Sequence, residues 1–380
     1  MKISMRFLCV FLVITLLGAY TAYADGEIKT TARSVILIEQ STGQVLYEQN
    51  ADEKLPIASV TKVMTMLLCM EALKSGKISM DEQVTASEHA CSMGGSQVYL
   101  EPGEQMSVSD MIKAIAVASG NDAAVAMSEH IMGSEQGFVD AMNARAHTLG
   151  MKNTHFVNCN GLDADDHYST ARDVAVMSAE LLKYDEIRPF LKIWMDSLRD
   201  GAFGLANTNK LIRFYPNAIG IKTGSTGKAK YCVSGAAQRD GLTLIAVVLA
   251  ADTTADRFET AKSLLNYGFA NYGIDNPVKP GEKIGKPAVI KGVSPSVDVI
   301  TQRGFSRIVP KGSGGKTDKK IIIQEKYKAP VAKNSIAGEM VLSENGKEIA
   351  KIPLVFADNV KKLSVINVYV DLLKYWGGQK

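Results

Sequence analysis

Three copies of a Ser-x-x-Lys tetrad occur in the chain, at Ser59–Lys62, Ser225–Lys228 and Ser313–Lys316. Such a tetrad can pair a serine nucleophile with a lysine base. The chemistry requires the lysine amine to lie beside the serine hydroxyl, in a site dry enough to lower the pKa of the amine. Residues three apart on a helix share a face, so a helical tetrad meets the first requirement.

Only the first tetrad is expected on a helix. Apolar residues recur after Ser59 at helical spacing, and Gly76 ends the pattern. Ser59 is therefore predicted at the first turn of a largely buried helix, where free N–H groups favour a developing oxyanion. The tetrad at Ser225–Lys228 follows a strand and contains a glycine, which predicts a turn. Two glycines in the tetrad at Ser313–Lys316 predict a flexible loop.

Two further motifs accompany the first tetrad. Ser119-Gly120-Asn121 interrupts a helical pattern 60 residues after Ser59, and Lys222-Thr223-Gly224 ends an apolar strand 163 residues after Ser59. Each motif alone is an ordinary break or strand end. Together and in this order, they resemble the Ser-x-x-Lys, Ser-x-Asn and Lys-Thr-Gly set of penicillin-binding proteins and class A β-lactamases.

A wider resemblance covers about residues 30–275. The segments SVILIEQSTGQVLYEQNADEKLPIASVTKVMT, LGMKNTHFVNCNGL, HYSTARD and NTNKL resemble serine-type D-alanyl-D-alanine carboxypeptidases, the low-molecular-mass penicillin-binding proteins. The resemblance implies a penicillin-binding/β-lactamase-like α/β (α+β) fold, with an antiparallel sheet, helices on both sides and a helical subdomain. It implies peptidoglycan stem peptides as substrate, covalent binding of β-lactam antibiotics, and no cofactor or metal.

The resemblance also implies roles for the motif residues. Ser59 attacks the carbonyl of the penultimate D-alanine and forms an acyl-enzyme, with Lys62 as general base. Ser119 and Lys222 relay the proton to the leaving D-alanine, and Asn121 fixes Lys62 and the substrate amide.

Substrate binding is expected from the Lys222 strand and from one arginine. Thr223 is expected to bind the terminal carboxylate, and Gly224 and Ser225 belong to the same binding strand. The main-chain N–H of Ser225 is expected to complete the oxyanion hole with that of Ser59. Arg257 in TTADRFE matches an arginine that helps to bind the carboxylate; the alternative is an exposed residue at a helix start, paired with an adjacent carboxylate. Lys230 departs from the family, which usually has glycine there.

The elements that must position these residues follow from apolar patterning. Strands are predicted at 34–39, 44–48, 218–223, 231–238 and 242–250, and a helix at about 255–272. Asp240-Gly241 predicts a hairpin turn. Residues 79–187 are mostly helical in pattern, with turns predicted at 94–95, 102–103, 120–121 and 158–161. Strands at both ends of this region predict one α/β domain whose sheet is completed by distant segments.

Four segments are predicted along the chain. Residues 1–24 read as a signal peptide, 25–276 as the enzyme domain, 277–358 as a small β domain and 359–380 as an amphipathic helix. Asn276-Pro277 and Pro280-Gly281 suggest the domain boundary. The last helix combines an apolar face with lysines and a Tyr-Trp pair, which favours an anionic membrane surface; the alternative is a helix docked on its own β domain.

Charge is distributed unevenly. Residues 25–276 carry 22 basic and 31 acidic side chains, whereas residues 277–380 carry 19 basic and 9 acidic ones. The second part is thus suited to an anionic surface. We predict an exported, peripherally anchored protein that lies at the outer face of the bacterial cytoplasmic membrane, in the periplasm or cell wall. Nucleic-acid binding is not expected, because the basic part lacks interleaved aromatic residues.

Cysteine and histidine placement predicts no metal site. The five histidines and the four cysteines beyond residue 24 show no zinc-ligand spacing. The cysteines can form disulfides or remain as buried thiols. His167 and Arg172 are expected to be structural.

The predicted function is a D-alanyl-D-alanine carboxypeptidase. An endopeptidase that cuts cross-links is an alternative that the motifs do not separate. A β-lactamase is disfavoured, because none of the glutamates between the second and third motifs is followed by Leu-Asn as in class A enzymes. A catalytically idle wall-binding module is disfavoured because all three motifs are intact.

Overall fold

The computed structural model describes residues 28–312, 317–366, 369 and 376. The predicted signal peptide, the tetrad at Ser313–Lys316 and most of the predicted tail helix lie outside the described residues.

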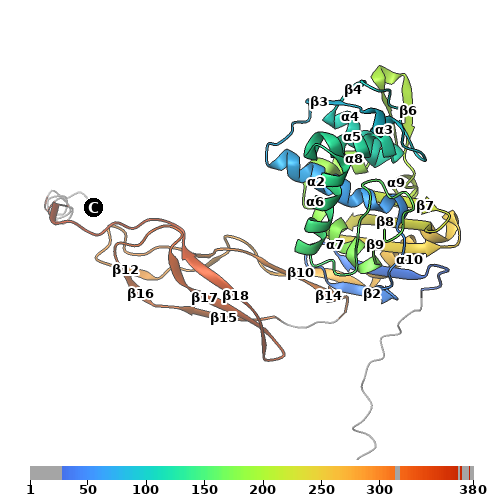
Figure 1. The fold of residues 1–380 in the computed structure, drawn as a ribbon. Coiled ribbons are helices and arrows are strands. Elements are labelled where there is room, and N and C mark those ends of the chain that lie inside the picture. The colour runs from blue at the N-terminus through green and yellow to red at the C-terminus, as the bar shows by residue number, and fades with distance from the viewer. Residues whose placement is uncertain (1–27, 313–316, 367–368, 370–375, 377–380) are drawn as a thin grey trace, which may run out of the picture.

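A five-stranded antiparallel sheet in the order β2-β1-β9-β8-β7 forms the centre of the N-terminal part (Figure 1). Its strands are β1 (Ser34–Glu39), β2 (Val45–Gln49), β7 (Ala218–Thr226), β8 (Lys230–Arg239) and β9 (Leu242–Ala251). All five were predicted, and β1 pairs with β9, so distant segments complete the sheet as expected. Asp240 and Gly241 form the turn between β8 and β9, both with positive φ as such a hairpin requires.

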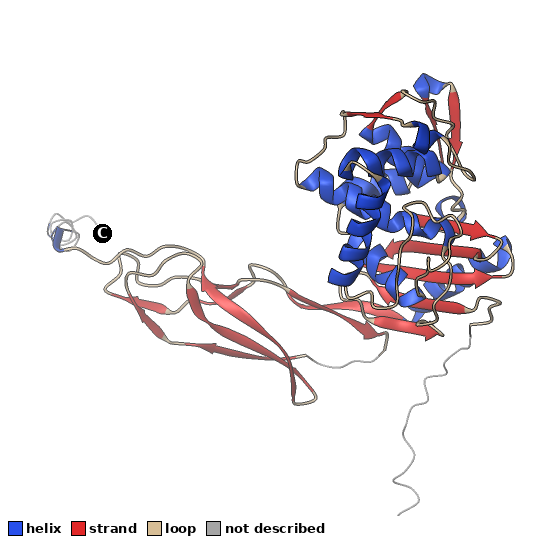
Figure 2. Ribbon diagram, in the orientation of Figure 1, coloured by secondary structure: helices blue, strands red, loops and turns tan. Residues whose placement is uncertain are grey.

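Helices cover both faces of this sheet (Figure 2). Alternate residues of β1 and β9 enter two separate apolar cores, so each strand is buried on both sides. One core joins Ile36 and Val247 to α2 (Lys62–Lys74) and α7 (Ala171–Leu181). The other joins Val35 and Val248 to α10 (Thr254–Asn271), the predicted helix after the last strand.

The region before β7 is helical with short strands. The remaining helices are α3 (Glu88–Cys91), α4 (Val108–Lys113), α5 (Asn121–Met132), α6 (Glu135–Thr148), α8 (Arg188–Leu191) and α9 (Leu211–Phe214). Shorter turns are η1 (Ala58–Thr61), η2 (Ala114–Ala118), η3 (Asp185–Ile187) and η4 (Arg199–Gly201), and the strands are β3 (Gln83–Thr85), β4 (Gln105–Ser107), β5 (Met195–Leu198) and β6 (Phe203–Ala206). Residues 149–170 contain no helix, contrary to the pattern, because their backbone instead bonds across the loop, as between His155 N and Tyr168 O at 2.9 Å.

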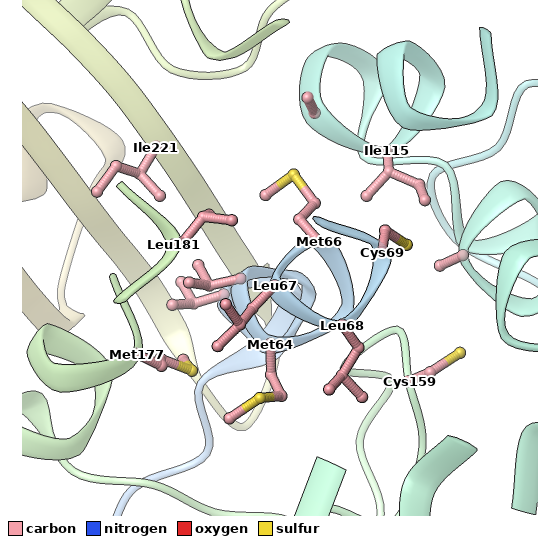
Figure 3. Close-up of a cluster of buried hydrophobic side chains, with 14 of the residues drawn as sticks. Met64, Met66, Leu67, Leu68, Cys69, Ile115, Cys159, Met177, Leu181 and Ile221 are labelled. Atoms are coloured by element: carbon pink, nitrogen blue, oxygen red, sulfur yellow. The ribbon is translucent and has the colours of Figure 1, made fainter. Parts of the chain in front are cut away.

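Helix α2 runs through the middle of the larger core, and its residues 62–70 are all buried. Met64 and Leu67 lie toward Met177 and Leu181 of α7, while Cys69 lies toward Ile115 of η2 (Figure 3). A helix packed on several sides has little freedom to shift. It is therefore a rigid support for whatever its first turn carries.

The C-terminal part consists of strands and extends away from the sheet described above (Figure 1). It contains a five-stranded sheet in the order β11-β13-β18-β17-β15 and two separate strand pairs, β10-β14 and β12-β16. The strands are β10 (Tyr272–Val278), β11 (Lys283–Gly285), β12 (Ala288–Ile290), β13 (Val299–Thr301), β14 (Phe305–Pro310), β15 (Asp318–Ile323), β16 (Lys326–Lys328), β17 (Ile336–Glu344) and β18 (Lys347–Phe356).

The expected boundary signal at Asn276-Pro277 falls inside a strand. β10 starts at Tyr272, directly after α10, and pairs with β14. The chain therefore passes from helix to the second part without a linker at 276–277, and the domain limits themselves stay a prediction.

Candidate active site

Ser59 lies in the short helical turn η1, directly before α2, which agrees with its predicted place at the start of a buried helix. The preceding residue, Ala58, has φ +48, an uncommon conformation for a residue with a Cβ. Ser59 is partly exposed, whereas both neighbours in the turn are buried. The turn thus presents one hydroxyl at the edge of the core.

Lys62 is fully buried and lies against that hydroxyl, with Nζ 2.9 Å from Ser59 Oγ. Its ammonium also donates to Asn121 Oδ1 at 2.5 Å and to the carbonyl oxygen of Asn160 at 2.6 Å. Burial lowers the pKa of Lys62 to about 7, against the opposing influence of Cys159 and Asp122. An amine with that pKa can accept a proton near neutral pH.

The second motif comes from the junction of η2 and α5. Ser119 ends η2 with a left-handed backbone, φ +64, and is buried. Asn121 begins α5, and its Nδ2 donates to the carbonyl of Gly94 at 2.6 Å, which fixes Oδ1 toward Lys62. Backbone strain of this kind at Ser119 costs roughly 1–3 kcal/mol and is often found at functional sites.

The third motif lies on β7, the edge strand of the sheet. Lys222 is buried, and its pKa lies well below the usual lysine value, through burial first and then the charges of Lys62 and Arg257. Thr223 is buried, and its hydroxyl shares a hydrogen bond with that of Thr208, at 2.6 Å.

Gly224 lies directly against the Ser59 turn. A Cβ there would come within 2.9 Å of Ser59 N and 2.7 Å of the Ile57 carbonyl. Only glycine allows this approach, which brings the edge of β7 beside the main-chain N–H of Ser59. Ser225 follows as an exposed residue within β7, so the predicted turn position is wrong for Ser225. Lys228 does lie in the turn, where it pairs with Asp165.

Arg257 is buried rather than exposed, which contradicts the alternative of an exposed residue at a helix start. Its Nη1 donates to the carbonyl of Gly224 at 3.1 Å and to that of Cys232 at 3.2 Å. The guanidinium also lies over the rings of Tyr231 and Phe258. Arg257 therefore attaches α10 to the motif strand, while the acidic residues adjacent to it are paired elsewhere.

Two residues of the site were not predicted. The Asn160 carbonyl binds Lys62, and Gly161 approaches the Ser59 turn so closely that a Cβ would lie 2.0 Å from the Ala58 carbonyl. The sequence signal was a turn at 158–161, which predicts neither contact because a backbone carbonyl has no side-chain signature.

His167 and Arg172 are structural, as expected. His167 Nδ1 accepts from Val157 N at 3.1 Å, and Nε2 lies 2.8 Å from Thr61 Oγ1 in the turn that carries Ser59. Arg172 pairs with Glu48 and Asp52.

The four described cysteines are unpaired, and within the described residues no group of three or more His, Cys, Asp or Glu side chains could hold a metal. Lys230 occupies the left-handed region at φ +54 and pairs with Asp252. That backbone conformation is the one that glycine adopts without strain, which agrees with the glycine usual there in the resembled family.

A mixed α/β fold with a buried lysine beside a serine, and with two further motifs around them, defines a penicillin-binding-type serine hydrolase. Residues 20–253 match the family model described as D-alanyl-D-alanine carboxypeptidase, and residues 272–362 match that of the penicillin-binding protein 5 C-terminal domain. The chain belongs to the D-alanyl-D-alanine carboxypeptidase family and is a serine carboxypeptidase. The predicted family, fold class and activity are thereby confirmed.

Individual relatives match between 64% and 96% of this chain. The D-alanyl-D-alanine carboxypeptidase DacF of Bacillus subtilis is 42% identical over 373 residues, which are 96% of each chain. The structure of penicillin-binding protein 5 from Haemophilus influenzae is similar with a TM-score of 0.71 and 31% identity, covering 88% of this chain and 98% of that one. Ampicillin-bound penicillin-binding protein D2 from Listeria monocytogenes has a TM-score of 0.59 and 33% identity, covering 64% and 99%.

Proposed function

We propose that Ser59 is the acyl-ester nucleophile of this carboxypeptidase and that Lys62 is its general base. The observation that carries the proposal is the buried Lys62 amine, 2.9 Å from Ser59 Oγ. In its neutral form the amine accepts the hydroxyl proton as Oγ attacks the carbonyl carbon of the penultimate D-alanine. Hydrogen bonds to Asn121 and Asn160 orient the amine for that transfer.

The oxyanion is proposed to be held by the main-chain N–H groups of Ser59 and Ser225. The close approach of Gly224 to Ser59 N supports this, because it brings the two chain segments that carry those N–H groups together. Donors fixed in advance stabilise the developing charge without reorganisation.

Departure of D-alanine requires a proton on the leaving nitrogen. We assign its delivery to Ser119 and Lys222, since burial lowers the pKa of Lys222 and so makes its ammonium a stronger proton donor. The carbon–nitrogen bond then breaks and leaves an ester on Ser59, which water hydrolyses. Thr223 and Arg257 are proposed to bind the terminal carboxylate of the substrate; the buried guanidinium also holds the motif strand in place.

Peptidoglycan stem peptides are the proposed substrate, and β-lactams are proposed to acylate Ser59. A relative of similar fold has been described in an ampicillin-bound form. The four glutamates between the second and third motifs support a carboxypeptidase over a β-lactamase. Glu129, Glu135 and Glu180 are bonded to Ser87, Cys159 and Arg145 respectively, and among the described residues no hydrogen bond or ion pair joins Glu186 to a motif residue.

The protein is proposed to be exported and held at an anionic membrane by its C-terminal helix. The signal-like residues 1–24 and the excess of basic residues after position 276 support this. No helix within the described residues is long and apolar enough to cross a bilayer.

The test uses residues 25–380, a peptide ending in D-Ala-D-Ala and a fluorescent penicillin. We expect release of one D-alanine per peptide and covalent labelling, both abolished in Ser59→Ala. Ser225→Ala is the matched control: it removes a hydroxyl from another Ser-x-x-Lys tetrad but keeps the main-chain N–H. Labelling of Ser59→Ala at the parent rate would refute the assignment. Cleavage of a cross-linked dimer faster than of the pentapeptide would favour the endopeptidase alternative.

A further inference from the structure

One turn of the β domain is joined to the start of the C-terminal tail. The turn, Ile290–Val293, begins at the last residue of β12 and is here called the distal turn. Val293 N donates to the Lys361 carbonyl at 2.9 Å, and Leu363 N donates to the Lys291 carbonyl at 2.8 Å. Gly292 forms a bridge with Lys362. The distal turn and residues 361–363 are thus one local structure, at the end of the β domain where the chain terminates (Figure 1).

The contact between the distal turn and residues 361–363 is tightly packed on its inner side. A Cβ at Gly292 would lie 2.7 Å from a methyl carbon of Val360, and Val360 is itself paired with Val331 of the neighbouring segment. The distal turn therefore cannot move independently of the tail.

The outer side of this structure carries apolar side chains that the protein leaves open. Ile290 is 48% exposed and Val293 is 50% exposed. Val365 and Ile366, which come shortly after residues 361–363 in the chain, are 86% and 75% exposed. Apolar side chains that gather at one end of a soluble chain suggest a surface that is covered by a partner.

The charge around these side chains identifies the partner. The segments 288–293, 326–334 and 357–366, joined by the pairing of β12 with β16 and by the two bridges, contain six lysines and one acidic residue, Asp358. All six lysines are exposed, and among the described residues none takes part in an ion pair: Lys291, Lys326, Lys328, Lys333, Lys361 and Lys362. Exposed lysines mixed with apolar side chains fit an anionic lipid surface. A second copy of the same surface would be repelled.

We propose that the distal turn Ile290–Val293 is a second membrane-contacting element, which enters the lipid interface together with the C-terminal helix. It rests on the proposed anchoring by that helix and adds a rigid contact to it. Two contacts fixed to each other restrict the angle between the β domain and the membrane, whereas a single terminal helix leaves that angle free. The acidic enzyme domain would then be held away from the surface by the length of the β domain.

The test compares residues 25–380 with Ile290→Ser/Val293→Ser in sedimentation with vesicles of phosphatidylcholine and phosphatidylglycerol. Because about half of each side chain is available for burial, we expect binding about tenfold weaker in the double variant. Ile321→Ser/Ile322→Ser is the matched control, since these β15 side chains are 47% and 44% exposed but lie outside the distal turn. We expect it to bind like the parent, and all three to release D-alanine from a soluble peptide at the same rate.

Each outcome is decisive. Parent-like binding by Ile290→Ser/Val293→Ser overturns the inference and leaves the anchor by the helix intact. Equal weakening in both double variants overturns it too, as does loss of a dimer rather than of lipid binding. Failure of the parent to bind phosphatidylglycerol vesicles overturns the proposed anchor as well.

Discussion

Replacing Gly161 with alanine tests whether the 158–161 loop sets the position of the nucleophile. Gly161 has φ +86, and an added Cβ would lie 2.0 Å from the Ala58 carbonyl oxygen and 2.9 Å from Ser59 N. Ordinary van der Waals contact begins at 3.4 Å, so the two segments must separate by about 1.4 Å. Both contacts are to backbone, so no side chain can rotate away to relieve them.

The expected result is a large loss of activity. A displacement of about 1 Å at a catalytic group can cost roughly 100-fold in rate. The same shift would pull the Asn160 carbonyl away from Lys62, which removes one of the acceptors that orient the base. We therefore expect Gly161→Ala to be acylated by a fluorescent penicillin about 100-fold more slowly than the parent.

Gly150→Ala separates this effect from backbone strain. Gly150 has φ +76, but nothing lies within 4 Å of an added Cβ. Both substitutions place alanine in the left-handed region at a cost of roughly 1–2 kcal/mol, which thermal unfolding measures. We expect Gly150→Ala to lose that stability and keep its acylation rate. Acylation of Gly161→Ala at the Gly150→Ala rate would refute the reasoning.

Three other predictions follow from single groups. Because the neutral amine of Lys62 is the proposed base and its pKa is about 7, the rate of acylation should rise with pH through about 7. In Lys62→Arg the rate of acylation should fall about 1,000-fold at every pH tested. An unchanged pH profile in Lys62→Arg would contradict the assignment. Burial lowers the pKa of His167 to about 4, so below pH 6.5, the pKa in the unfolded chain, the unfolded state binds more protons than the folded state. The free energy of unfolding, measured by denaturant titration, should therefore fall by about 3 kcal/mol between pH 6.5 and 4. His167→Gln should not show this loss. Arg257→Gln should lower kcat/KM about 10–100-fold for a peptide acid but much less for its C-terminal amide, provided that its unfolding shows an intact fold; equal losses on both peptides would leave Arg257 a purely structural role.

Local patterns predicted most of the sheet and the three motifs. The strands β1, β7, β8 and β9 are apolar runs bounded by turn residues, and Asp240-Gly241 suits only a tight hairpin, so these elements required little knowledge of the rest of the chain. The motif residues were identifiable because their side-chain types and order are specific. The region 149–170 was missed because its backbone is satisfied by partners across a loop, and such pairing leaves no periodic pattern.

Only the tertiary structure decided how the site works. Ser59 and Lys62 share a turn by sequence, but the burial that lowers the pKa of Lys62 comes from segments 59 and 98 residues away. Likewise, the sequence left Arg257 as either a carboxylate-binding residue or an exposed helix residue, and only the packing of α10 on the sheet carries its guanidinium to the Gly224 carbonyl. The chemical type of each side chain is determined by the sequence alone. Desolvation and backbone contacts are sums over distant segments, so they exist only once the chain is folded.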